Sequence, residues 1–424
     1  MTRGATANLL LPLLLAALLL APGCRPAPAG GGGGGGAATP ESPPDDRVRI
    51  GAFMSLTGDT AQYGISAYNG MRMAVEEANS AGGVGGRQVE LIVQDTRSDG
   101  VETEVVVRRL VSESRVHALL GEVVSSRTLL AARVAQAARV PMLTPSATTP
   151  EVTKVGDYVF RSCYTDPHQG AALAHFAARD LGASRAAFLI DAGQNYSSAL
   201  ARFIREEFTR RGGEVVLTTY YGAGAADYTS QLREVAAARP EVVFIPGYYL
   251  EAGLMARQLK GLGLEAPLVG GDGWDSPRLW EIGGPSLVGA YFSSHYSVDD
   301  TDPVVSNFVE GYRRLFNGVP DAFAATAYDA ARVMLAALAR APTLDPAAVR
   351  DALAATRDFP GVTGPVTFDS NRDAVKPVVV IRIEENGRHA VWRRIEPDQI
   401  ADWLAPSPTP TPTPRATRRK SKKR

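Results

Sequence analysis

The chain has 424 residues, of which 45 are Lys or Arg and 45 are Asp or Glu, and 45% are hydrophobic. This length allows two lobes with a substantial core, and the composition is that of a globular protein. Seven basic residues lie between Arg415 and Arg424, so the rest of the chain is mildly acidic, which excludes a basic face for nucleic acid.

A targeting segment stands at the N-terminus. Arg3 precedes an apolar run from Leu9 to Leu20, which is too short for a mature transmembrane helix, and small residues follow before Cys24. This cysteine resembles that of a bacterial lipobox, in which the thiol is acylated, although alanine stands three residues before it where leucine is more usual. We expect a signal peptide over 1–23 and a lipidated flexible linker over 24–46. A conventional secretory signal with an incidental Cys24 is the alternative.

From Arg47 onward, strands and helices alternate, which predicts parallel sheets covered by helices on both faces. A first series has strands at 48–53, 89–94, 117–120 and 140–143 with helices at 65–80, 101–114 and after Ser126. A second series has helices at 170–181, up to 211, 228–238, 250–261 and 277–282, with strands at 186–190, 214–219, 241–246 and 268–269. Helices at 303–316, 322–339 and 346–354 and a strand pair at 378–383 and 390–395 follow, and 405–424 forms a disordered basic tail.

The stretch 121–154 carries the first site hypothesis. Ser125 follows one predicted strand and Thr148 follows the next, so the carboxyl ends of two strands present hydroxyl groups at one place. Ser125 is placed to cap the helix after it, and a helix N-terminus attracts an anionic group such as a carboxylate. The alternative is that Ser125 is only a helix cap and 146–150 only a turn.

Ordered motifs along residues 47–400 resemble one family. They are F-M-S-L-T-G-D-T-A-Q-Y-G, N-G-M-R-M-A-V-E-E-A-N, G-E-V-V-S-S, T-P-S-A-T-T-P, R-S-C-Y-T-D-P-H-Q-G, D-A-G-Q-N-Y, G-Y-Y-L-E-A-G, G-G-D-G-W and G-V-T-G-P-V-T-F-D. The series is similar to the periplasmic leucine/isoleucine/valine-binding proteins, the solute receptors of branched-chain amino acid ABC transporters. Its order is specific, whereas each motif alone is weak.

The resemblance implies a type I periplasmic-binding fold, in which two doubly wound α/β lobes are joined by three hinge crossings. Here the crossings fall near Thr165, His295 and Ser370. One lobe would comprise 47–164 plus 296–369, and the other 166–294 plus 371–404. Closure of the lobes on a ligand would turn about these hinges, and Asp166 would serve the hinge or its hydrogen bonds.

The first lobe would hold the ligand carboxylate. The resemblance assigns this role to Ser125, to backbone groups of Ala147 and to the hydroxyl of Thr148. Some relatives have a disulfide in this lobe, but Arg97 and Val124 stand at its two positions here. The one cysteine of the body, Cys163, cannot form an internal disulfide and reads as a small buried apolar residue.

The remaining site residues follow from the same resemblance. Tyr63 would pack over the ligand side chain, Tyr196 and Tyr248 would meet the ligand on closure, and Asp272 would pair with the α-ammonium, where glutamate is usual. These residue types suit an amino-acid ligand, because a zwitterion needs hydroxyl or N–H donors at one end and a carboxylate at the other. The alternatives are ordinary core tyrosines and a solvated turn aspartate.

We therefore expect an exported, lipid-anchored, monomeric binding protein on the periplasmic or cell-surface side, with an ABC permease as partner and no cofactor or metal. Catalysis is not expected, because no H-E-x-x-H, Walker or G-x-S-x-G motif occurs. His168 and His175 read as surface or structural residues, since no third metal ligand is near them in the sequence. The closest alternative is a sensor of the same fold for an amide, urea or aromatic acid, and a hydrolase is the remote one.

Overall fold

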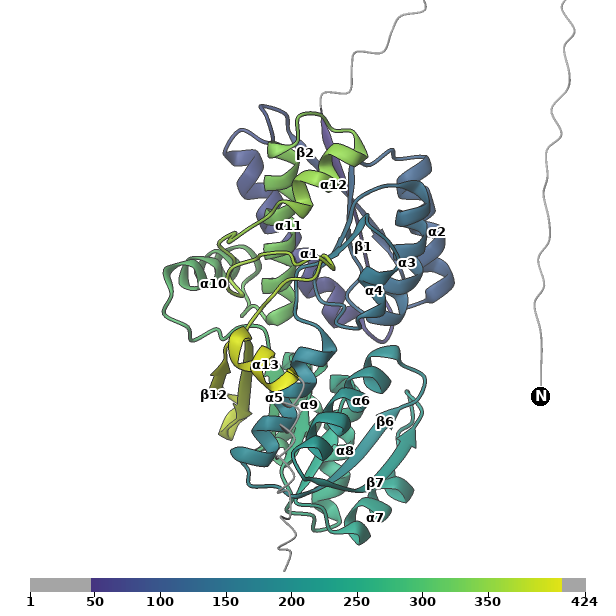
Figure 1. The fold of residues 1–424 in the computed structure, drawn as a ribbon, viewed down its shortest axis with the longest axis vertical. Helices are drawn as coiled ribbons and strands as arrows, with labels where there is room; N and C mark the ends of the chain where they lie inside the picture. The colour runs from purple at the N-terminus through teal and green to yellow at the C-terminus, as the bar shows by residue number, and fades with distance from the viewer. Residues whose placement is uncertain (1–46, 406–424) are drawn as a thin grey trace, which may run out of the picture. The chain divides into compact units, whose positions relative to one another are not determined.

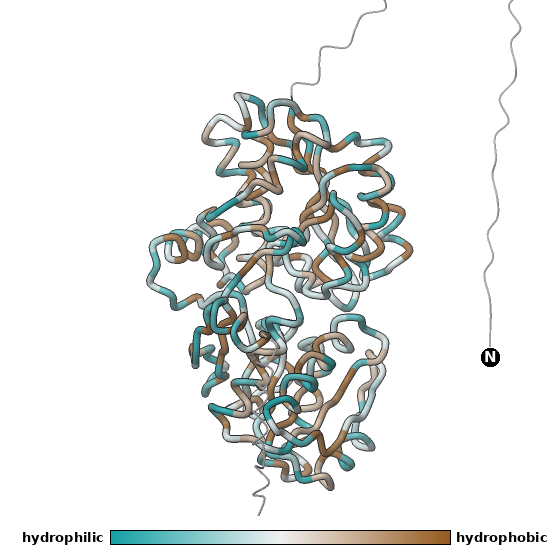
Figure 2. The backbone as a smooth tube through the Cα atoms, in the orientation of Figure 1, coloured by the Kyte–Doolittle hydropathy of each residue, from teal (hydrophilic) through white to brown (hydrophobic). Residues whose placement is uncertain are grey.

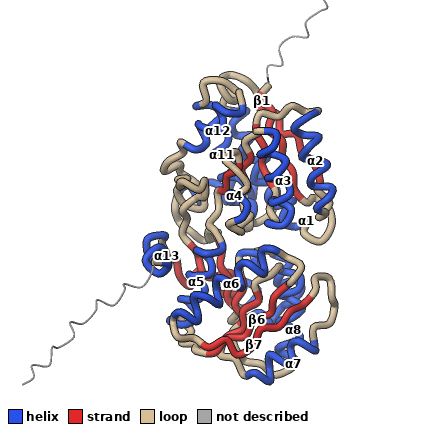
Figure 3. Tube along the Cα trace, turned by 45° about the vertical axis from the view of Figure 1, so that its right-hand side comes forward, coloured by secondary structure: helices blue, strands red, loops and turns tan. Residues whose placement is uncertain are grey.

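The computed structural model describes residues 47–405. The predicted signal peptide, Cys24 and linker lie outside this range, as does the predicted tail beyond residue 405. Within the range, strands and helices alternate around two separate sheets (Figures 1 and 3). We call the parts built on them the first and the second lobe.

The first lobe contains a parallel five-stranded sheet in the order β2-β1-β3-β4-β5. Its strands are β1 (Val48–Met54), β2 (Val89–Asp95), β3 (Ala118–Gly121), β4 (Met142–Thr144) and β5 (Val159–Arg161). The helices between them are α1 (Ala61–Ser80), α2 (Gly100–Ser112), α3 (Ser125–Ala138) and α4 (Glu151–Lys154). The chain winds to β2 on one side of β1 and to β3 on the other, so this sheet is doubly wound.

The second lobe contains a seven-stranded sheet in the order β12-β11-β10-β9-β8-β6-β7. Its strands are β6 (Arg185–Asp191), β7 (Glu214–Tyr221), β8 (Val242–Ile245), β9 (Leu268–Gly270), β10 (Tyr291–Ser294), β11 (Val378–Ile383) and β12 (His389–Ile395). The helices are α5 (Asp166–Arg179), α6 (Asn195–Arg210), α7 (Thr229–Ala238), α8 (Tyr249–Gly261), η1 (Asp272–Trp274), α9 (Pro277–Gly283), η2 (Gly284–Leu287), η3 (Glu385–Gly387) and α13 (Pro397–Leu404). The predicted strand pair joins this sheet antiparallel, so the sheet is mixed and not wholly parallel.

Three later helices are α10 (Pro303–Phe316), α11 (Ala322–Arg340) and α12 (Pro346–Ala354), and α11 packs along α1 of the first lobe. The chain thus leaves the first lobe between β5 and α5, returns between β10 and α10, and leaves again between α12 and β11. Thr165, His295 and Ser370 lie in these three segments. The lobe boundaries drawn at these residues stay a prediction.

Both faces of each central strand are buried, so a hydrophobic core lies on either side of the sheet. In β1, Val48, Ile50 and Ala52 point to the core shared with α1 and α11, and Phe53 points to the core under α2 and α3. Figure 2 shows the same apolar stretches along the strands inside each lobe. Among residues 47–405, α11 is long and apolar enough to span a membrane, but 83% of its apolar window is buried in the protein.

Several element boundaries differ from those predicted. Helix α5 begins at Asp166, four residues before the predicted start, because Pro167 fits the first turn of a helix. Helix α1 likewise begins at Ala61, which places Tyr63 in its first turn. The short elements α4, β5, β10 and α13 were not predicted, since their apolar runs are brief. Trp403 of α13 stacks on His175 of α5 at 3.7 Å between ring centroids, which gives this histidine a structural role.

Candidate functional site

The predicted site residues follow three neighbouring strands in each sheet. In the first lobe, Tyr63 follows β1, Ser125 follows β3 and Thr148 follows β4. Tyr196, Tyr248 and Asp272 follow β6, β8 and β9 of the second lobe. Carboxyl ends of parallel strands lie at one edge of a sheet, and ligands bind there where the strand order reverses. The two sheets therefore supply facing halves of one site.

A small cavity brings five of the seven predicted residues together. Residues of both lobes line it: Tyr63, Val123, Val124, Ser125, Ser146 and Phe323 from the first, and Tyr196, Tyr248, Asp272 and Gly273 from the second. Its volume is about 10 Å³, room for roughly one water molecule. The two lobes are thus packed closely on each other at this place.

Ser125 lies at the cavity, but it is not the helix cap that we expected. Helix α3 begins at Ser125 itself, so Val124 occupies the cap position, and no side chain caps the helix there. The hydroxyl of Ser125 makes no hydrogen bond within residues 47–405, and the residue as a whole is 2% exposed. It stands at the N-terminus of α3, where unpaired N–H groups and the helix dipole favour an anionic group.

Ala147 and Thr148 do not line the cavity, whereas the neighbouring Ser146 does. The N–H of Ala147 donates to Thr144 Oγ1 at 3.3 Å, and its carbonyl accepts from Arg161 Nη1 at 2.7 Å. Thr148 Oγ1 is buried and has no hydrogen-bond partner within the described chain. The backbone of Ala147 is therefore already engaged. The hydroxyl of Ser146, which was not among the predicted ligand-binding residues, lies 2.8 Å from Thr326 Oγ1 and can exchange one further hydrogen bond with a ligand.

Tyr63 connects the two lobes through its hydroxyl group. Its Oη donates to the carbonyl of Gly273 and accepts from the N–H of Tyr249 at 3.2 Å. Its ring packs against Phe323 at 4.4 Å and against Tyr248 at 5.7 Å between centroids. The predicted aromatic residue thus joins the lobes as well as forming part of the cavity wall.

Aromatic rings form the second-lobe wall of the cavity. Tyr196 stacks on Tyr248 with 5.4 Å between the ring centroids. Tyr248 Oη has no hydrogen-bond partner within residues 47–405, although the atom is buried. An apolar wall with a free hydroxyl suits a ligand that has an aliphatic body and a polar end.

Asp272 lies in η1 directly after β9 and is 2% exposed, so the alternative of a solvated turn residue is wrong. Its Oδ1 accepts from Tyr196 Oη at 2.8 Å and from Gln169 Nε2 at 2.6 Å. Its Oδ2 lies 3.1 Å from His295 Nε2, and the His295 ring stacks on Tyr164. A carboxylate has about four acceptor sites, so these three contacts leave capacity for a ligand ammonium.

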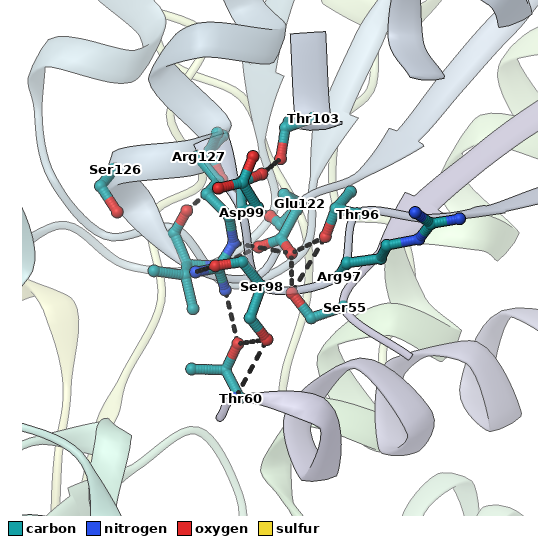
Figure 4. Close-up of polar contacts among 12 residues, drawn as sticks. Ser55, Thr60, Thr96, Arg97, Ser98, Asp99, Thr103, Glu122, Ser126 and Arg127 are labelled. Atoms are coloured by element: carbon teal, nitrogen blue, oxygen red, sulfur yellow. Dashed lines mark hydrogen bonds and ion pairs between the residues drawn. The ribbon is translucent and has the colours of Figure 1, made fainter. Parts of the chain in front are cut away.

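A buried polar network positions the loop before α3 (Figure 4). Glu122 is fully buried, and its Oε1 accepts from Ser55 Oγ at 2.7 Å, from Thr96 Oγ1 at 3.0 Å and from Arg127 Nε at 3.2 Å. Its Oε2 accepts from the N–H of Val124 at 2.7 Å. These bonds fix the segment 123–125 at the cavity, and the sequence signal was an acid directly after an apolar strand.

Asp166 lies at the first crossing and is fully buried. Its N–H donates to the carbonyl of Thr148 at 2.9 Å, which ties the start of α5 to the first lobe. Its carboxylate oxygens have no hydrogen-bond partner within the described chain. Burial raises the pKa of Asp166 to about 7.

Comparisons with known proteins match this architecture. The model of the periplasmic binding protein family matches residues 47–388. The leucine-, isoleucine-, valine-, threonine-, and alanine-binding protein of Pseudomonas aeruginosa is 30% identical over 329 residues, which are 77% of this chain and 87% of that protein. The Leu/Ile/Val-binding protein of Escherichia coli K12 is 26% identical over 327 residues, 77% of this chain and 88% of that protein.

Solved structures agree. The leucine binding protein LivK of Thermotoga maritima is 37% identical with a TM-score of 0.79, covering 83% of this chain and 99% of that one. LivJ of Streptococcus pneumoniae, in complex with isoleucine, is 31% identical with a TM-score of 0.77, covering 82% and 98%. A benzoate complex of a solute binding protein from R. palustris, 21% identical with a TM-score of 0.74 over 82% and 96%, shows likeness of fold alone. The predicted two-lobed α/β fold is confirmed.

Proposed function

Because the chain belongs to the periplasmic binding protein family, we propose that it captures an amino acid between its lobes and delivers it to an ABC transporter permease. The ligand would be branched-chain or similar in size and shape. The observation that carries the proposal is the meeting of Ser125 and Asp272 at one cavity from opposite lobes. Hydroxyls stand on one side and an acid on the other, as a zwitterion requires.

The ligand carboxylate would bind at the N-terminus of α3, where Ser125 and Ser146 present hydroxyls. The ammonium would bind Asp272 Oδ2, which accepts from His295 but has room for a further donor. The side chain would lie among Tyr63, Tyr248 and Phe323. The participation of Thr148 and Ala147 stays a prediction, and the engaged backbone of Ala147 weighs against its direct contact.

A cavity of about 10 Å³ is far smaller than the roughly 300–1,000 Å³ of drug-sized ligand sites. An amino acid would therefore enter after the lobes move apart, which breaks the contacts of the Tyr63 hydroxyl with Gly273 and Tyr249. Two further contacts would break: Ser126 Oγ with Gln194 Oε1 at 3.3 Å, and Tyr249 Oη with the carbonyl of Asp59 at 3.3 Å. Contacts of this kind would hold the lobes together again once the cavity has widened around the ligand.

We also propose that the protein is exported and carries a lipid anchor at Cys24. Its activity would be ligand binding without catalysis. Mass spectrometry of the mature protein tests the anchor. An unmodified residue 24, or an N-terminus elsewhere, would remove this part of the proposal and leave the binding activity untouched.

The decisive experiment is a thermal-shift and calorimetric titration of the purified protein with the amino acids, small amides and benzoate. A ligand that binds only the folded state raises its melting temperature. We expect leucine, isoleucine or valine to bind with a stoichiometry of one. Binding of benzoate or an amide without any amino acid would favour the sensor alternative instead.

A further inference from the structure

A second cavity lies beside the second crossing and is separate from the cavity of the proposed amino-acid site. Its volume is about 540 Å³. The second lobe contributes Asp275 and Trp280, the α10–α11 connection contributes Asp321, and the segment after β10 contributes Tyr296. None of these four residues lines the cavity at Asp272, so the two cavities are distinct.

Two buried carboxylates face this cavity. Asp275 is 6% exposed, its Oδ2 accepts from Ser294 Oγ at 2.7 Å, and its Oδ1 accepts no hydrogen bond within residues 47–405. Asp321 is 9% exposed and accepts from Ser66 Oγ at 2.6 Å and from the N–H of Ala324 at 3.0 Å. Every one of these donors is neutral.

Unlike Glu122 and Asp329, these two acids have no counterion in the part of the chain that the structure describes. Glu122 lies 3.2 Å from Arg127 Nε, and Asp329 lies 3.9 Å from Lys376 Nζ. Within residues 47–405, no basic nitrogen comes within 4.0 Å of either Asp275 or Asp321. A buried carboxylate without a counterion is costly, so a cationic ligand would be stabilised here.

The rest of the cavity fits an organic cation better than a bare ion. Trp280 and Tyr296 supply aromatic surface, and the Tyr296 hydroxyl is already engaged by the carbonyl of Pro320. Aromatic faces attract ammonium groups and also cover an aliphatic body. The volume exceeds that of a single hydrated ion and admits a small molecule.

The electrostatics support a requirement for positive charge. Burial, followed by the negative charge of Asp275, raises the pKa of Asp321 to about 7. Burial also raises the pKa of Asp275, against the lowering influence of His389. The other charged or titratable groups that line the cavity are Asp299, Arg313, Arg388, His389 and Tyr296. Both arginines and Asp299 are exposed, so solvent screens them more than the two buried acids.

We propose that this cavity is a second ligand site, which takes a small protonated primary amine with a short apolar body. The ammonium group contacts Asp275 and Asp321, and the body lies against Trp280 and Tyr296.

The proposed site is connected to the amino-acid site through one short segment. Ser294 donates to Asp275, and the next residue, His295, contacts Asp272. In addition, the N–H of Asp275 donates to the carbonyl of Asp272 at 3.0 Å. Asp321 precedes α11, which packs on the first lobe, so an amine that contacts both acids also bridges the lobes. Binding at one site then changes affinity at the other, and the effect is reciprocal.

The test is calorimetric titration of the full mature protein with isobutylamine at pH 8, with isobutanol as the uncharged ligand of similar shape. We expect saturable binding of the amine and none of the alcohol. Asp275→Asn and Asp321→Asn should each weaken amine binding by about tenfold or more. Asp299→Asn, which removes an exposed acid at the rim of the same cavity, should change the affinity by less than about twofold.

The Asp272→Asn variant separates this proposal from the proposed function, because it disables the amino-acid site and should still bind isobutylamine. Melting temperatures confirm that each variant is folded, and Asp275→Asn keeps an acceptor for Ser294. Equal binding of amine and alcohol, an unaltered affinity in Asp275→Asn, no amine binding at all, or complete displacement of the amine by saturating leucine would each overturn the inference.

Discussion

Asp272→Asn is the substitution that addresses the proposed ammonium contact most directly. The asparagine Oδ1 can still accept from Tyr196 and Gln169, and its amide group can donate to His295 Nε2 in the tautomer that carries its hydrogen on Nδ1. The residue therefore keeps its hydrogen bonds and loses only its charge. We expect the fold and the melting temperature without ligand to change little.

The magnitude follows from the charge and burial of this contact. Asp272 is 2% exposed, so its interaction with an ammonium is desolvated. Hydrogen bonds to charged groups contribute about 1.5–3 kcal/mol and neutral ones about 0.5–1.5 kcal/mol, and the ligand ammonium also loses its counterion. A loss of about 1.5–3 kcal/mol corresponds to a roughly ten- to hundredfold higher Kd.

The assay is calorimetry with leucine and with 4-methylpentanoate, which has the leucine skeleton without the amine. The wild-type protein should lose affinity when leucine is replaced by 4-methylpentanoate, and Asp272→Asn should discriminate much less between the two. Asp299→Asn serves as the control for a general change of charge. If Asp272→Asn binds leucine as tightly as the wild type, Asp272 does not bind the ammonium, and the proposed ligand orientation is wrong.

Three further predictions concern the supporting residues. Glu122→Gln should lower the free energy of unfolding, measured by urea titration, by about 2–4 kcal/mol, because it leaves Arg127 buried without its counterion. As a control, Glu104→Gln removes an acid from an exposed ion pair and should lower the free energy of unfolding by less than about 1 kcal/mol. Tyr63→Phe should raise the leucine Kd by roughly 5- to 150-fold, because the closed form loses two hydrogen bonds of about 0.5–1.5 kcal/mol each. An unchanged Kd would show that this hydroxyl does not hold the lobes closed. The pKa of Asp166 is about 7 in the folded protein and near 4 in the unfolded chain, so the folded state binds more protons and its stability falls as the pH rises from about 4 to 7. Asp166→Asn should reduce this slope in urea titrations at several pH values, and an unaltered slope would place its origin elsewhere.

The positions of the site residues at strand ends could be predicted from the sequence, whereas the hydrogen-bond partners of those residues could not. Ser125 and Asp272 each follow a short apolar run, which is a local pattern, and the parallel topology then brings strand ends to one edge of the sheet. Ala147 was predicted to offer its backbone to the ligand, but Thr144 and Arg161 occupy those groups. The spacing of these residues in the sequence does not predict these hydrogen bonds, because the Arg161 side chain comes close to Ala147 only in the folded protein.

The amino-acid sequence by itself determined the alternation of strands and helices in two series, because hydrophobic periodicity and turn residues act over a few neighbouring residues. The arrangement as two doubly wound lobes was an expectation from the family resemblance. Only the tertiary structure decided the environment of each polar group. The carboxylate of Asp272 meets Gln169 and Tyr196 across 103 and 76 residues of chain, and Asp321 has no counterion among residues 47–405. Desolvation and pairing depend on which distant side chains pack together, and that is a property of the folded chain alone.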